Sequence, residues 1–355
     1  MSNKDLQSEI DRHLAILRRL QAPSGLFLAA AEPGVSTGYD KSWLRDNFYE
    51  VMAFEEVGDW DTSTKTWHAL LDIFLKHEAK INWAINDRPR FTYQYIHARY
   101  NPETFEEFWE EWGNKQNDAI GCILYAIGKR ERSGHSVLRN DDDKRIVGRL
   151  VHYLSTIEYW HDPDNGVWEE YEEVHASSIG ACIAGLQMIQ ESGIADVPRD
   201  LVAQGYESLH KLLPRESHTK FADLAQLSLM FPYQVLTREE EDTILSNIEY
   251  HLSKDKGVVR YKTDRYYNAN EDGWSEEAEW TMGFPWLSII YRQRGEHDKA
   301  DAWLKKAGEA LDIDGKLPEL YFSHTNAPNE NNPLGWSESL YIVALAKALH
   351  AVTEF

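Results

Sequence analysis

Residues 165–189 read NGVWEEYEEVHASSIGACIAGLQMI, so an acidic cluster beside a tryptophan leads into a run of small and apolar residues. Small side chains let a helix approach its neighbours closely, and this run predicts a tightly packed inner helix. Glu169 is then expected at the mouth of that helix. A carboxyl group held beside an indole there can have a raised pKa and act as a general acid. The plainer interpretation is that the acidic cluster only complements the positive end of the helix dipole.

The composition argues against several classes of partner. The chain has 355 residues, with 37 basic and 59 acidic side chains and a net charge of -22, which argues against nucleic acid and anionic polymers. It also has 13 Trp, 18 Tyr and 12 Phe. Aromatic faces with polar rims suit neutral, ring-shaped ligands such as sugars, although aromatic side chains also serve as filler between helices.

Nothing in the sequence indicates a membrane span, a disulfide or a metal pair. Cys122 and Cys182 each lie in an apolar helical run, which favours buried thiols. The first residues lead directly into an amphipathic helix without an apolar signal core, and no stretch approaches the roughly 18 apolar residues of a membrane span. We therefore expect a cytoplasmic protein that binds neither membranes nor metal.

Apolar residues recur mostly with a helical period. Leu6, Ile10, Leu14 and Leu17 form one stripe, which ends near Pro23. Further helices are expected at about 44–57, 62–78, 117–131, 140–158, 176–192, 197–212, 221–230, 237–251, 275–294, 297–311 and 335–351.

Two stretches interrupt this pattern. Residues 257–261 predict one short β-segment, and residues 80–115 predict a long irregular stretch, which in a compact chain is usually functional. About twelve helices without a linker or a repeat predict an all-α fold, an (α/α)6 barrel that takes in residues 1–355 as a single catalytic domain. An open helical superhelix is the competing fold, but it would normally show a repeat period.

Polar and aromatic motifs fall at alternate helix junctions, as they would if all lay at one end of such a barrel. Local interpretations exist for some of them: Arg45 and Asp46 could form a surface ion pair, and Asn117 or Asp118 could be an ordinary N-cap. The stretches are GYDKSWLRDN at 38–47, WGNKQND at 112–118, WEE at 168–170, RYKTD at 260–264, GKLPE at 315–319 and NPLGWSE at 332–338.

As a set, these motifs resemble the glucoamylase-type glycoside hydrolases, family 15. The resemblance runs from about residue 25 to 350, and six elements occur in the family's order. They are WLRD at 43–46, WG at 112–113 with QND at 116–118, WEE at 168–170, RY at 260–261 with Asp264, LPE at 317–319, and PLGWS at 333–337.

The resemblance implies an enzyme without a cofactor that removes one glucose at a time from non-reducing ends, with inversion at the anomeric carbon. By position, Glu169 resembles the general acid and Glu319 the general base. The implied substrate-binding residues are Trp43, Arg45, Asp46, Trp112, Glu170, Arg260 and Trp336.

These roles agree with what the chemistry requires. Inverting hydrolysis needs a protonated carboxyl for the leaving oxygen and an ionised one to activate water, with the two about 6.5 to 9.5 Å apart. Trp168 and the inner helix could keep Glu169 protonated near neutral pH, while polar neighbours could keep Glu319 ionised. On Glu319 alone, an exposed loop carboxylate would be the simpler interpretation.

The sequence departs from the family pattern in three places. Glu172 lies so close to Glu169 that it is the second choice for the acid. The N-terminal β-sandwich of prokaryotic relatives and a starch-binding module are absent, so we expect short isomalto- or malto-oligosaccharides as substrates. The long loop resembles the family only loosely and is assigned to outer subsites through Tyr93, Tyr95, His97, Arg99 and Tyr100.

Other functions remain open at this level. The regulatory subunits of phosphorylase kinase also resemble this family, so a non-catalytic regulatory or carbohydrate-binding protein is one alternative. A trehalase or a glycosyl phosphorylase is another. The sequence contains no His-Glu-x-x-His zinc motif and no Gly-x-Ser-x-Gly elbow, and its 14 histidines are scattered. Linkage preference is not predicted.

Overall fold

The structure is a computed structural model, and it describes residues 3–30, 38–110, 112–269 and 276–353. Its helices are α1 (Asn3–Leu20), α2 (Leu44–Glu56), α3 (Trp60–Lys76), α4 (Glu78–Asp87), α5 (Asn117–Arg132), α6 (Asp141–Ile157), α7 (Ala176–Ser192), α8 (Leu201–Leu212), α9 (Arg238–His251), α10 (Gly283–Gln293), α11 (His297–Glu309) and α12 (Gly335–Thr353). Two 3-10 helices, η1 (Thr92–Gln94) and η2 (Leu224–Leu229), and four two-residue strands complete the list: β1 (Ser42–Trp43), β2 (Arg99–Tyr100), β3 (Glu279–Trp280) and β4 (Leu320–Tyr321).

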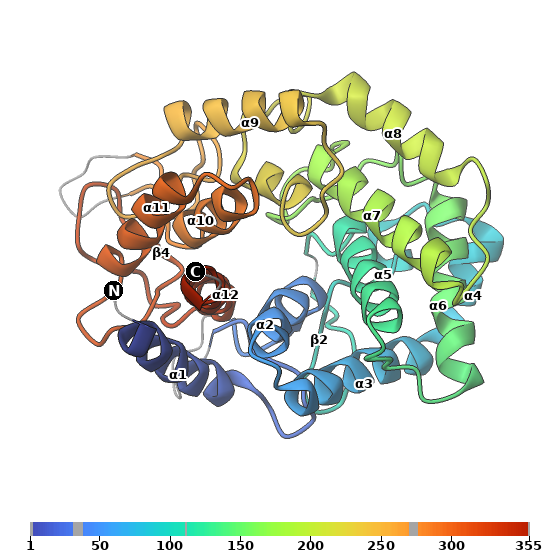
Figure 1. Ribbon diagram of the computed structural model, residues 1–355. Helices are drawn as coiled ribbons and strands as arrows, with labels where there is room; N and C mark the ends of the chain where they lie inside the picture. The colour runs from blue at the N-terminus through green and yellow to red at the C-terminus, as the bar shows by residue number, and fades with distance from the viewer. Residues whose placement is uncertain (1–2, 31–37, 111, 270–275, 354–355) are drawn as a thin grey trace.

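The helices form two concentric rings (Figure 1). Within the described ranges, the inner ring consists of α2, α5, α7, η2, α10 and α12, each of which contacts the next, and α12 contacts α2. The outer helices α1, α3, α6, α8, α9 and α11 alternate with the inner ones along the chain and pack against them. The prediction of an all-α (α/α)6 barrel is confirmed, and the α12–α2 contact excludes an open superhelix.

Four predicted elements differ from the structure. Helix α4 lies inside the stretch that we expected to be irregular, and its buried Ile81 and Ala84 explain why, because α4 packs on α6 outside the ring. The expected helix at 221–230 is the short 3-10 helix η2, which ends just before Pro232, a residue without a backbone donor.

The expected strand at 257–261 is a set of isolated bridges, among them Val258 with Trp280. The helix that we expected at 275–294 begins at Gly283, because Glu279 and Trp280 form β3 instead (residue 275 itself lies outside the described ranges). Strand β3 pairs antiparallel with β4, in the register Glu279–Tyr321 and Trp280–Leu320. This pairing ties the segment before α10 to the residues that follow Glu319.

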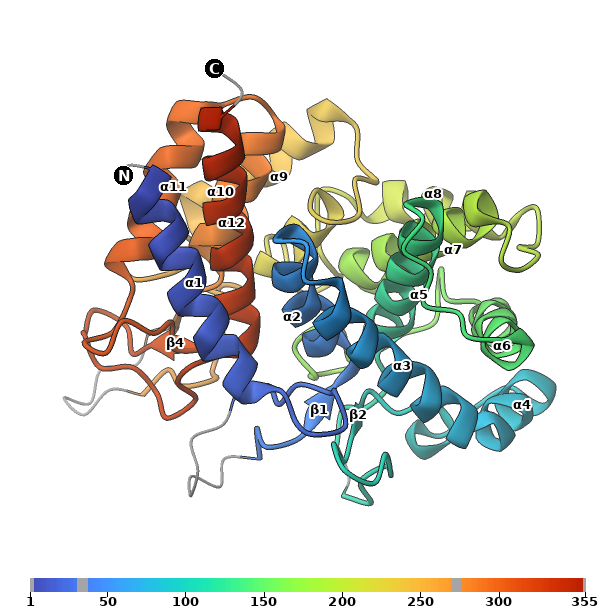
Figure 2. The ribbon, with the colours of Figure 1, turned by 60° about the horizontal axis from the view of Figure 1, so that its bottom comes forward.

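The short strands and the loops before the inner helices gather at one end of the barrel (Figure 2). Strand β1 pairs with β2 in the register Ser42–Tyr100 and Trp43–Arg99, directly before α2 begins at Leu44. The prediction that the motif loops share one end therefore holds for the chain as the structure describes it.

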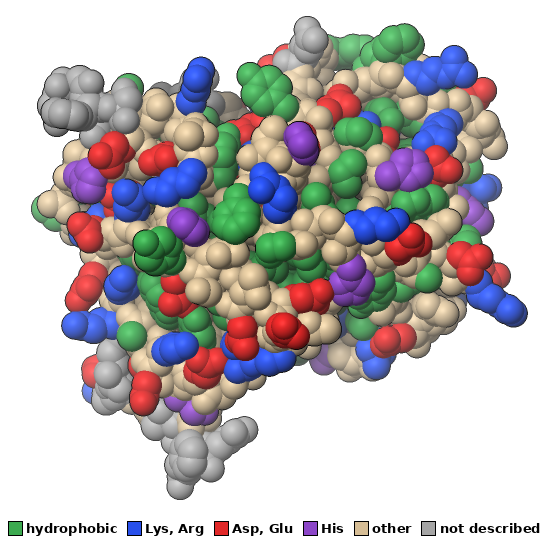
Figure 3. Space-filling model, turned by 90° about the horizontal axis from the view of Figure 1, so that it is seen from above, with side chains coloured by type: hydrophobic (Ala, Val, Ile, Leu, Met, Phe, Trp, Pro, Cys, Tyr) green, Lys and Arg blue, Asp and Glu red, His purple; other side chains and the backbone are tan. Residues whose placement is uncertain are grey.

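The surface is of mixed charge on the face shown in Figure 3, where acidic and basic side chains are interspersed. Within the described residues, we find no helix with the length and apolar character needed to cross a bilayer.

Helices α5 and α7 approach each other closely, as the small residues of the opening stretch predict. A Cβ at Gly121 would lie 2.4 Å from the carbonyl carbon of Ala181, and a Cβ at Gly185 would lie 2.4 Å from the carbonyl oxygen of Gly121. Cys122 and Cys182, next to this contact, are buried free thiols. Glycine is thus required here by backbone contact between two inner helices.

This contact leads to a test with a matched control. Gly121→Ala should lower the free energy of unfolding by about 1–3 kcal/mol, because the added methyl group forces two helices apart. Gly148→Ala in α6 should instead raise it by roughly 0.5–1 kcal/mol, because a helical glycine is replaced where the nearest atom to the new Cβ lies 3.7 Å away. Urea denaturation measures both, and equal effects would contradict the close contact.

Candidate active site

A cavity of about 290 Å³ lies where the motif loops meet. The structure brings together at its wall the two first-choice catalytic residues and the seven substrate-binding residues that the resemblance implies. These are Trp43, Arg45, Asp46, Trp112, Glu169, Glu170, Arg260, Glu319 and Trp336.

Each side chain reaches the cavity from a segment that leads into an inner helix or from its first turn. Arg45 and Asp46 belong to the first turn of α2, and Trp336 is the second residue of α12. Glu169 lies in the loop before α7, and Glu319 directly precedes β4. Because inner helices all run in the same direction through the ring, these starts converge at one end.

Glu169 has the environment of a proton donor. Its backbone is left-handed, with φ 63°, and its N–H donates to the Gly166 carbonyl oxygen at 3.3 Å. The side chain is 22% exposed, and Oε1 accepts from Arg45 Nη2 at 3.1 Å. Burial raises the pKa of Glu169 to about 7 against the lowering effect of Arg45, and the charge of Asp46 adds to the rise. Near neutral pH this carboxyl is therefore partly protonated.

Glu319 is more deeply enclosed and is held by three donors. It is 1% exposed. The Tyr39 hydroxyl donates to Oε1 at 2.7 Å, and Asn331 Nδ2 donates to Oε2 at 2.7 Å, beside a second donor from Asn329. Burial raises its pKa, while these hydrogen bonds favour the ionised form. The interpretation of Glu319 as an exposed loop carboxylate is thus wrong.

The sequence did not single out these partners of Glu319. Tyr39 lies inside one of the quoted motifs, but Asn329 and Asn331 lie in a loop without periodicity or motif. Tyr266 also lines the cavity, and its hydroxyl lies 3.1 Å from that of Tyr39. Only their position around a buried carboxylate reveals what they do.

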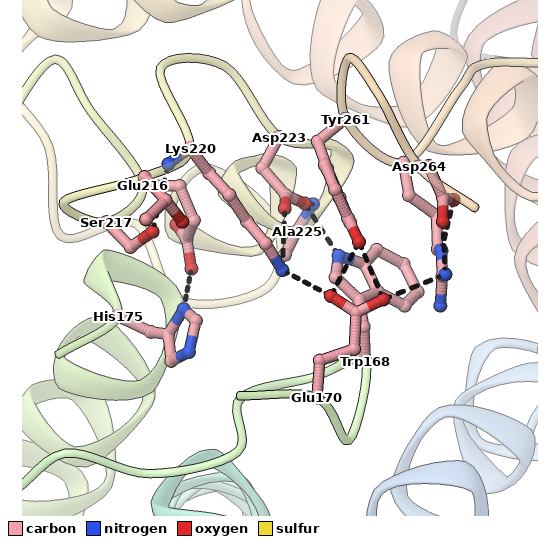
Figure 4. Close-up of polar contacts among 12 residues, drawn as sticks. Trp168, Glu170, His175, Glu216, Ser217, Lys220, Asp223, Ala225, Tyr261 and Asp264 are labelled. Carbon is pink, nitrogen blue, oxygen red and sulfur yellow. Dashed lines mark hydrogen bonds and ion pairs between the residues drawn. The ribbon is translucent and has the colours of Figure 1, made fainter. Parts of the chain in front are cut away.

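Glu170 is an ionised group anchored by two cations (Figure 4). It accepts from Lys220 Nζ at 2.8 Å, from Arg260 Nη2 at 3.1 Å and from the Tyr261 hydroxyl at 2.7 Å. Burial opposes its ionisation, but Arg260 and Lys220 outweigh it, so the pKa of Glu170 is lowered. Arg260 is itself fixed by Asp264, with two contacts of 2.7 Å.

Trp168 closes the wall between Glu169 and η2. Its indole Nε1 donates to Asp223 Oδ1 at 2.7 Å, as Figure 4 shows, and the same oxygen accepts from the Ala225 N–H at 2.8 Å. The indole ring therefore cannot turn away from the cavity without leaving a buried carboxylate short of a donor.

Glu172, our second choice for the acid, lies outside the cavity. Its side chain is 42% exposed and pairs with Lys115 at 3.4 Å. The geometry therefore favours Glu169. The chain reverses direction in the turn at 166–170, and this turn separates the two carboxyl groups.

The residues that we assigned to outer subsites divide into three groups. Tyr93 and His97 line a second cavity beside the first. Tyr95 and Tyr100 are buried in the core, so their assignment is wrong. Arg99 lies beneath Trp112, with its guanidinium carbon 4.0 Å from the ring centroid.

The described residues contain no group of three or more His, Cys, Asp or Glu side chains placed to hold a metal ion.

Residues 13–192, just over half of the chain, match the model of the glycosyl hydrolases family 15. The chain belongs to this family.

Two relatives of this family 15 chain differ in what their names say. A probable phosphorylase b kinase regulatory subunit alpha of Caenorhabditis elegans is 25% identical over 85% of this chain and 30% of its own length. An uncharacterized glycosyl hydrolase of Methanocaldococcus jannaschii is 23% identical over 96% of this chain and 56% of its own length. The chain thus spans between 30% and 56% of the length of these relatives, and family membership alone does not decide its activity.

Solved structures support the fold. A wild-type glycosidase has a TM-score of 0.82 at 18% identity and covers 98% of both chains. A bacterial glucoamylase complexed with acarbose has a TM-score of 0.67 at 15% identity, over 97% of this chain and 55% of that one.

The environment of Glu169 gives a prediction that requires no substrate. In ¹³C NMR of protein with labelled glutamate carboxyl groups, the resonance that disappears in Glu169→Gln should titrate with a midpoint near pH 7. Asp46→Asn should move that midpoint down, because a nearby negative charge is removed. A midpoint at the ordinary glutamate value of about 4.3 would show that Glu169 is not desolvated.

Proposed function

We propose that this protein is an inverting, exo-acting glycoside hydrolase that releases β-glucose from the non-reducing ends of short α-gluco-oligosaccharides. One observation carries the proposal: Glu169 and Glu319 line one cavity in environments that differ in kind. Glu169 is the group whose pKa lies near 7, and Glu319 is the group surrounded by donors to its ionised form. Paired carboxyl groups with separate environments are the requirement of glycoside hydrolysis.

In the proposed mechanism, Glu169 donates its proton to the glycosidic oxygen as the bond to the anomeric carbon breaks. Glu319 accepts a proton from a water molecule that attacks the opposite face of the ring. Arg45 and Asp46 bind hydroxyl groups of the terminal sugar, and Arg45 also limits how far the pKa of Glu169 rises. Neither step requires a metal or a cofactor.

The floor of the cavity supports the exo mode of action. Directly beneath it, Trp336 stacks on Tyr49 with ring centroids 4.3 Å apart, and Tyr49 meets the buried Trp286 at 5.5 Å. These aromatic rings come from three inner helices, α2, α10 and α12, and pack together below the cavity. A cavity that is closed on this side accepts the end of a sugar chain and excludes its middle.

The second cavity is placed to receive the rest of the substrate. It has a volume of about 1030 Å³ and shares Trp112, Glu169 and Glu170 with the first. Its wall presents Phe91 and Tyr93, which are 59% and 70% exposed and stacked with centroids 5.8 Å apart. Stacked, exposed aromatic rings beside a catalytic cavity suit the apolar faces of sugar rings.

Charges in this second cavity are balanced, which favours a neutral ligand. Lys80 pairs with Glu107 at 2.8 Å, and Glu110 pairs with Lys41 at 2.5 Å and also with Arg99. In the first cavity, Arg45 and Arg260 are likewise paired with carboxylates. A phosphorylase would need cations left for phosphate, so hydrolysis is the better supported reaction.

A non-catalytic regulatory role has one observation in its favour, the likeness to a probable phosphorylase b kinase regulatory subunit. The full set of cavity residues, with both carboxyl groups in place, supports the enzyme instead.

A ¹H NMR time course with maltose, isomaltose, panose and trehalose tests the proposal. Early release of β-glucose from one of them is expected, and the rate should fall as pH rises through about 7, because Glu169 must be protonated. Glu169→Gln and Glu319→Gln should each lower turnover by about 100-fold or more without loss of the fold. The leaving glucose of a disaccharide keeps its own anomeric configuration, so only the glucose from the non-reducing end reports the stereochemistry, and its release as the α anomer would indicate retention. No release from any sugar would favour the regulatory alternative.

The second cavity gives a separate prediction about chain length. Replacing Phe91 and Tyr93 together by Ala should lower kcat/KM for a tetra- or pentasaccharide about tenfold, the effect of ~1.4 kcal/mol, because stacking on two rings is lost. The value for the disaccharide should stay the same. Tyr250→Ala, which removes another exposed ring outside both cavities, is the control. Equal losses for long and short substrates would place the outer sugars elsewhere.

A further inference from the structure

We infer that His13 of α1 and Glu338 of α12 are positioning residues for the general base, through a buried hydrogen-bond chain that ends on the backbone of the Glu319 loop. The inference rests on the proposed function for the role of Glu319 as the base, whereas the hydrogen-bond chain itself is independent of that function. Both side chains are 0% exposed, and neither lines the catalytic cavity.

Glu338 is the point at which this chain meets the loop. Its Oε1 accepts from the backbone N–H of Leu317 at 2.8 Å. Leu317 lies two residues before Glu319. The Glu338 carboxylate therefore fixes the position of the backbone from which Glu319 extends to the cavity.

Backbone groups hold the loop at two more points: Leu317 O accepts from the Leu334 N–H at 2.9 Å, and the Glu319 N–H donates to Asn331 O at 2.9 Å. Two side chains also bind it, because Thr281 Oγ1 donates to Pro318 O at 2.5 Å and Asp312 Oδ1 accepts from the Lys316 N–H at 2.8 Å.

His13 orients Glu338 from the outer ring. Arg12 Nη2 lies 3.0 Å from His13 Nε2, and because a guanidinium can only donate, Nε2 is the acceptor. The ring proton therefore sits on Nδ1, which donates to Glu338 Oε2. Tyr341 of α12 meets the imidazole edge-on, with centroids 4.8 Å apart, and fixes the plane of the ring.

Arg12 connects this chain to the turn before the base as well. Its Nη2 donates to Glu9 Oε2 at 2.6 Å, and Nη1 packs so closely on Gly315 that a Cβ there would lie 1.8 Å from it. Gly315 has φ 72°, a conformation that other residues rarely adopt. Helix α1 thus holds the segment 315–319 twice, once by packing on Gly315 and once through His13 and Glu338.

The direction of the effect follows from which atoms are held. Of the proposed substrate-binding residues, Arg45, Trp112 and Glu170 lie on other segments. Trp336 lies on the same helix as Glu338, but its ring is held by stacking on Tyr49. Leu317, in contrast, leads directly to the base. Loss of the chain should therefore misplace Glu319 relative to the attacking water and lower kcat, with little change in KM. A displacement of about 1 Å in such a group can cost on the order of 100-fold.

Kinetics of three variants on the disaccharide that the wild type hydrolyses test the inference. Glu338→Leu and His13→Leu should lower kcat by about 10- to 100-fold with KM within about twofold. The kcat of Glu338→Gln should lie between that of these two variants and that of the wild type, because an amide offers one acceptor atom where a carboxylate offers two. If Glu338→Leu does not fold, the isosteric Glu338→Gln and His13→Leu decide the question.

The matched control is Glu55→Leu. Glu55 is another carboxylate at the heart of a network, accepting from Arg130 Nη1 at 2.9 Å and Trp67 Nε1 at 3.0 Å, but it lines neither the first nor the second cavity. Glu55→Leu should lower the free energy of unfolding without lowering kcat. An unchanged kcat in folded Glu338→Leu and His13→Leu, or a rise in KM alone, would overturn the inference.

Hydrogen exchange separates this inference from the proposed function. In Glu338→Leu, the peptide 315–321 should exchange faster than in the wild type, while the peptide 165–172 with Glu169 should not change. This readout stands even if the wild type hydrolyses none of the sugars, and unchanged exchange in 315–321 would also overturn the inference.

Discussion

The site depends first on the backbone contact between α5 and α7, which Gly121 and Gly185 permit. The loops that enter these two helices are tied together: Asn165 N donates to Lys115 O at 2.7 Å, and Asp164 Oδ2 accepts from the Asn117 N–H, the first of α5, at 2.7 Å. The turn that carries Glu169 is therefore built on the entrance of a neighbouring helix. The left-handed backbone of Glu169 is thus supported by hydrogen bonds between the loop before α7 and the residues at the start of α5.

Around this scaffold, the two carboxyl groups are distinguished by what faces them. Arg45, which contacts Glu169, is shared with Gln116 at 2.7 Å and with Asp118 at 3.3 Å, so only part of its charge is available to ionise Glu169. Glu319 receives neutral donors from Tyr39 and two asparagines, which favour its ionised form. The positions of their loops in the ring bring the two carboxyl groups together. The side chains that contact each carboxyl group then give Glu169 and Glu319 different tendencies to hold a proton.

Much of this arrangement could be predicted from the sequence, because its signals are local. The small residues of 176–185 mark an inner helix, and motifs before Leu44, Asn117 and Gly335 mark helix entrances. Helix α4 was missed because its two buried positions, Ile81 and Ala84, are too few to show a period among polar neighbours. The fourth inner segment, η2, was expected as an α-helix because residues 221–230 are rich in apolar side chains, a composition that does not distinguish a short 3-10 helix from an α-helix.

The partners of the catalytic candidates were less accessible to sequence reasoning, for a physical reason. Asn329 and Asn331 act on Glu319 through a loop, and Lys220 reaches Glu170 across 50 positions of the chain. Such contacts leave no spacing pattern. Glu172 could be separated from Glu169 only once the turn between them was known.

Closure of the barrel by α12, which contacts both α2 and α1, has a consequence for biogenesis. Helix α1 is synthesised long before α12, against which it packs, and the wall of the cavity includes Trp336 from α12. Until α12 has been synthesised, the apolar faces of α1 and of the inner helices that pack against α12 remain exposed to solvent. Contacts between such distant segments make folding slow and the unfinished chain prone to aggregation. A prematurely terminated chain that lacks α12 would lose the closure of the barrel and the floor of its cavity together.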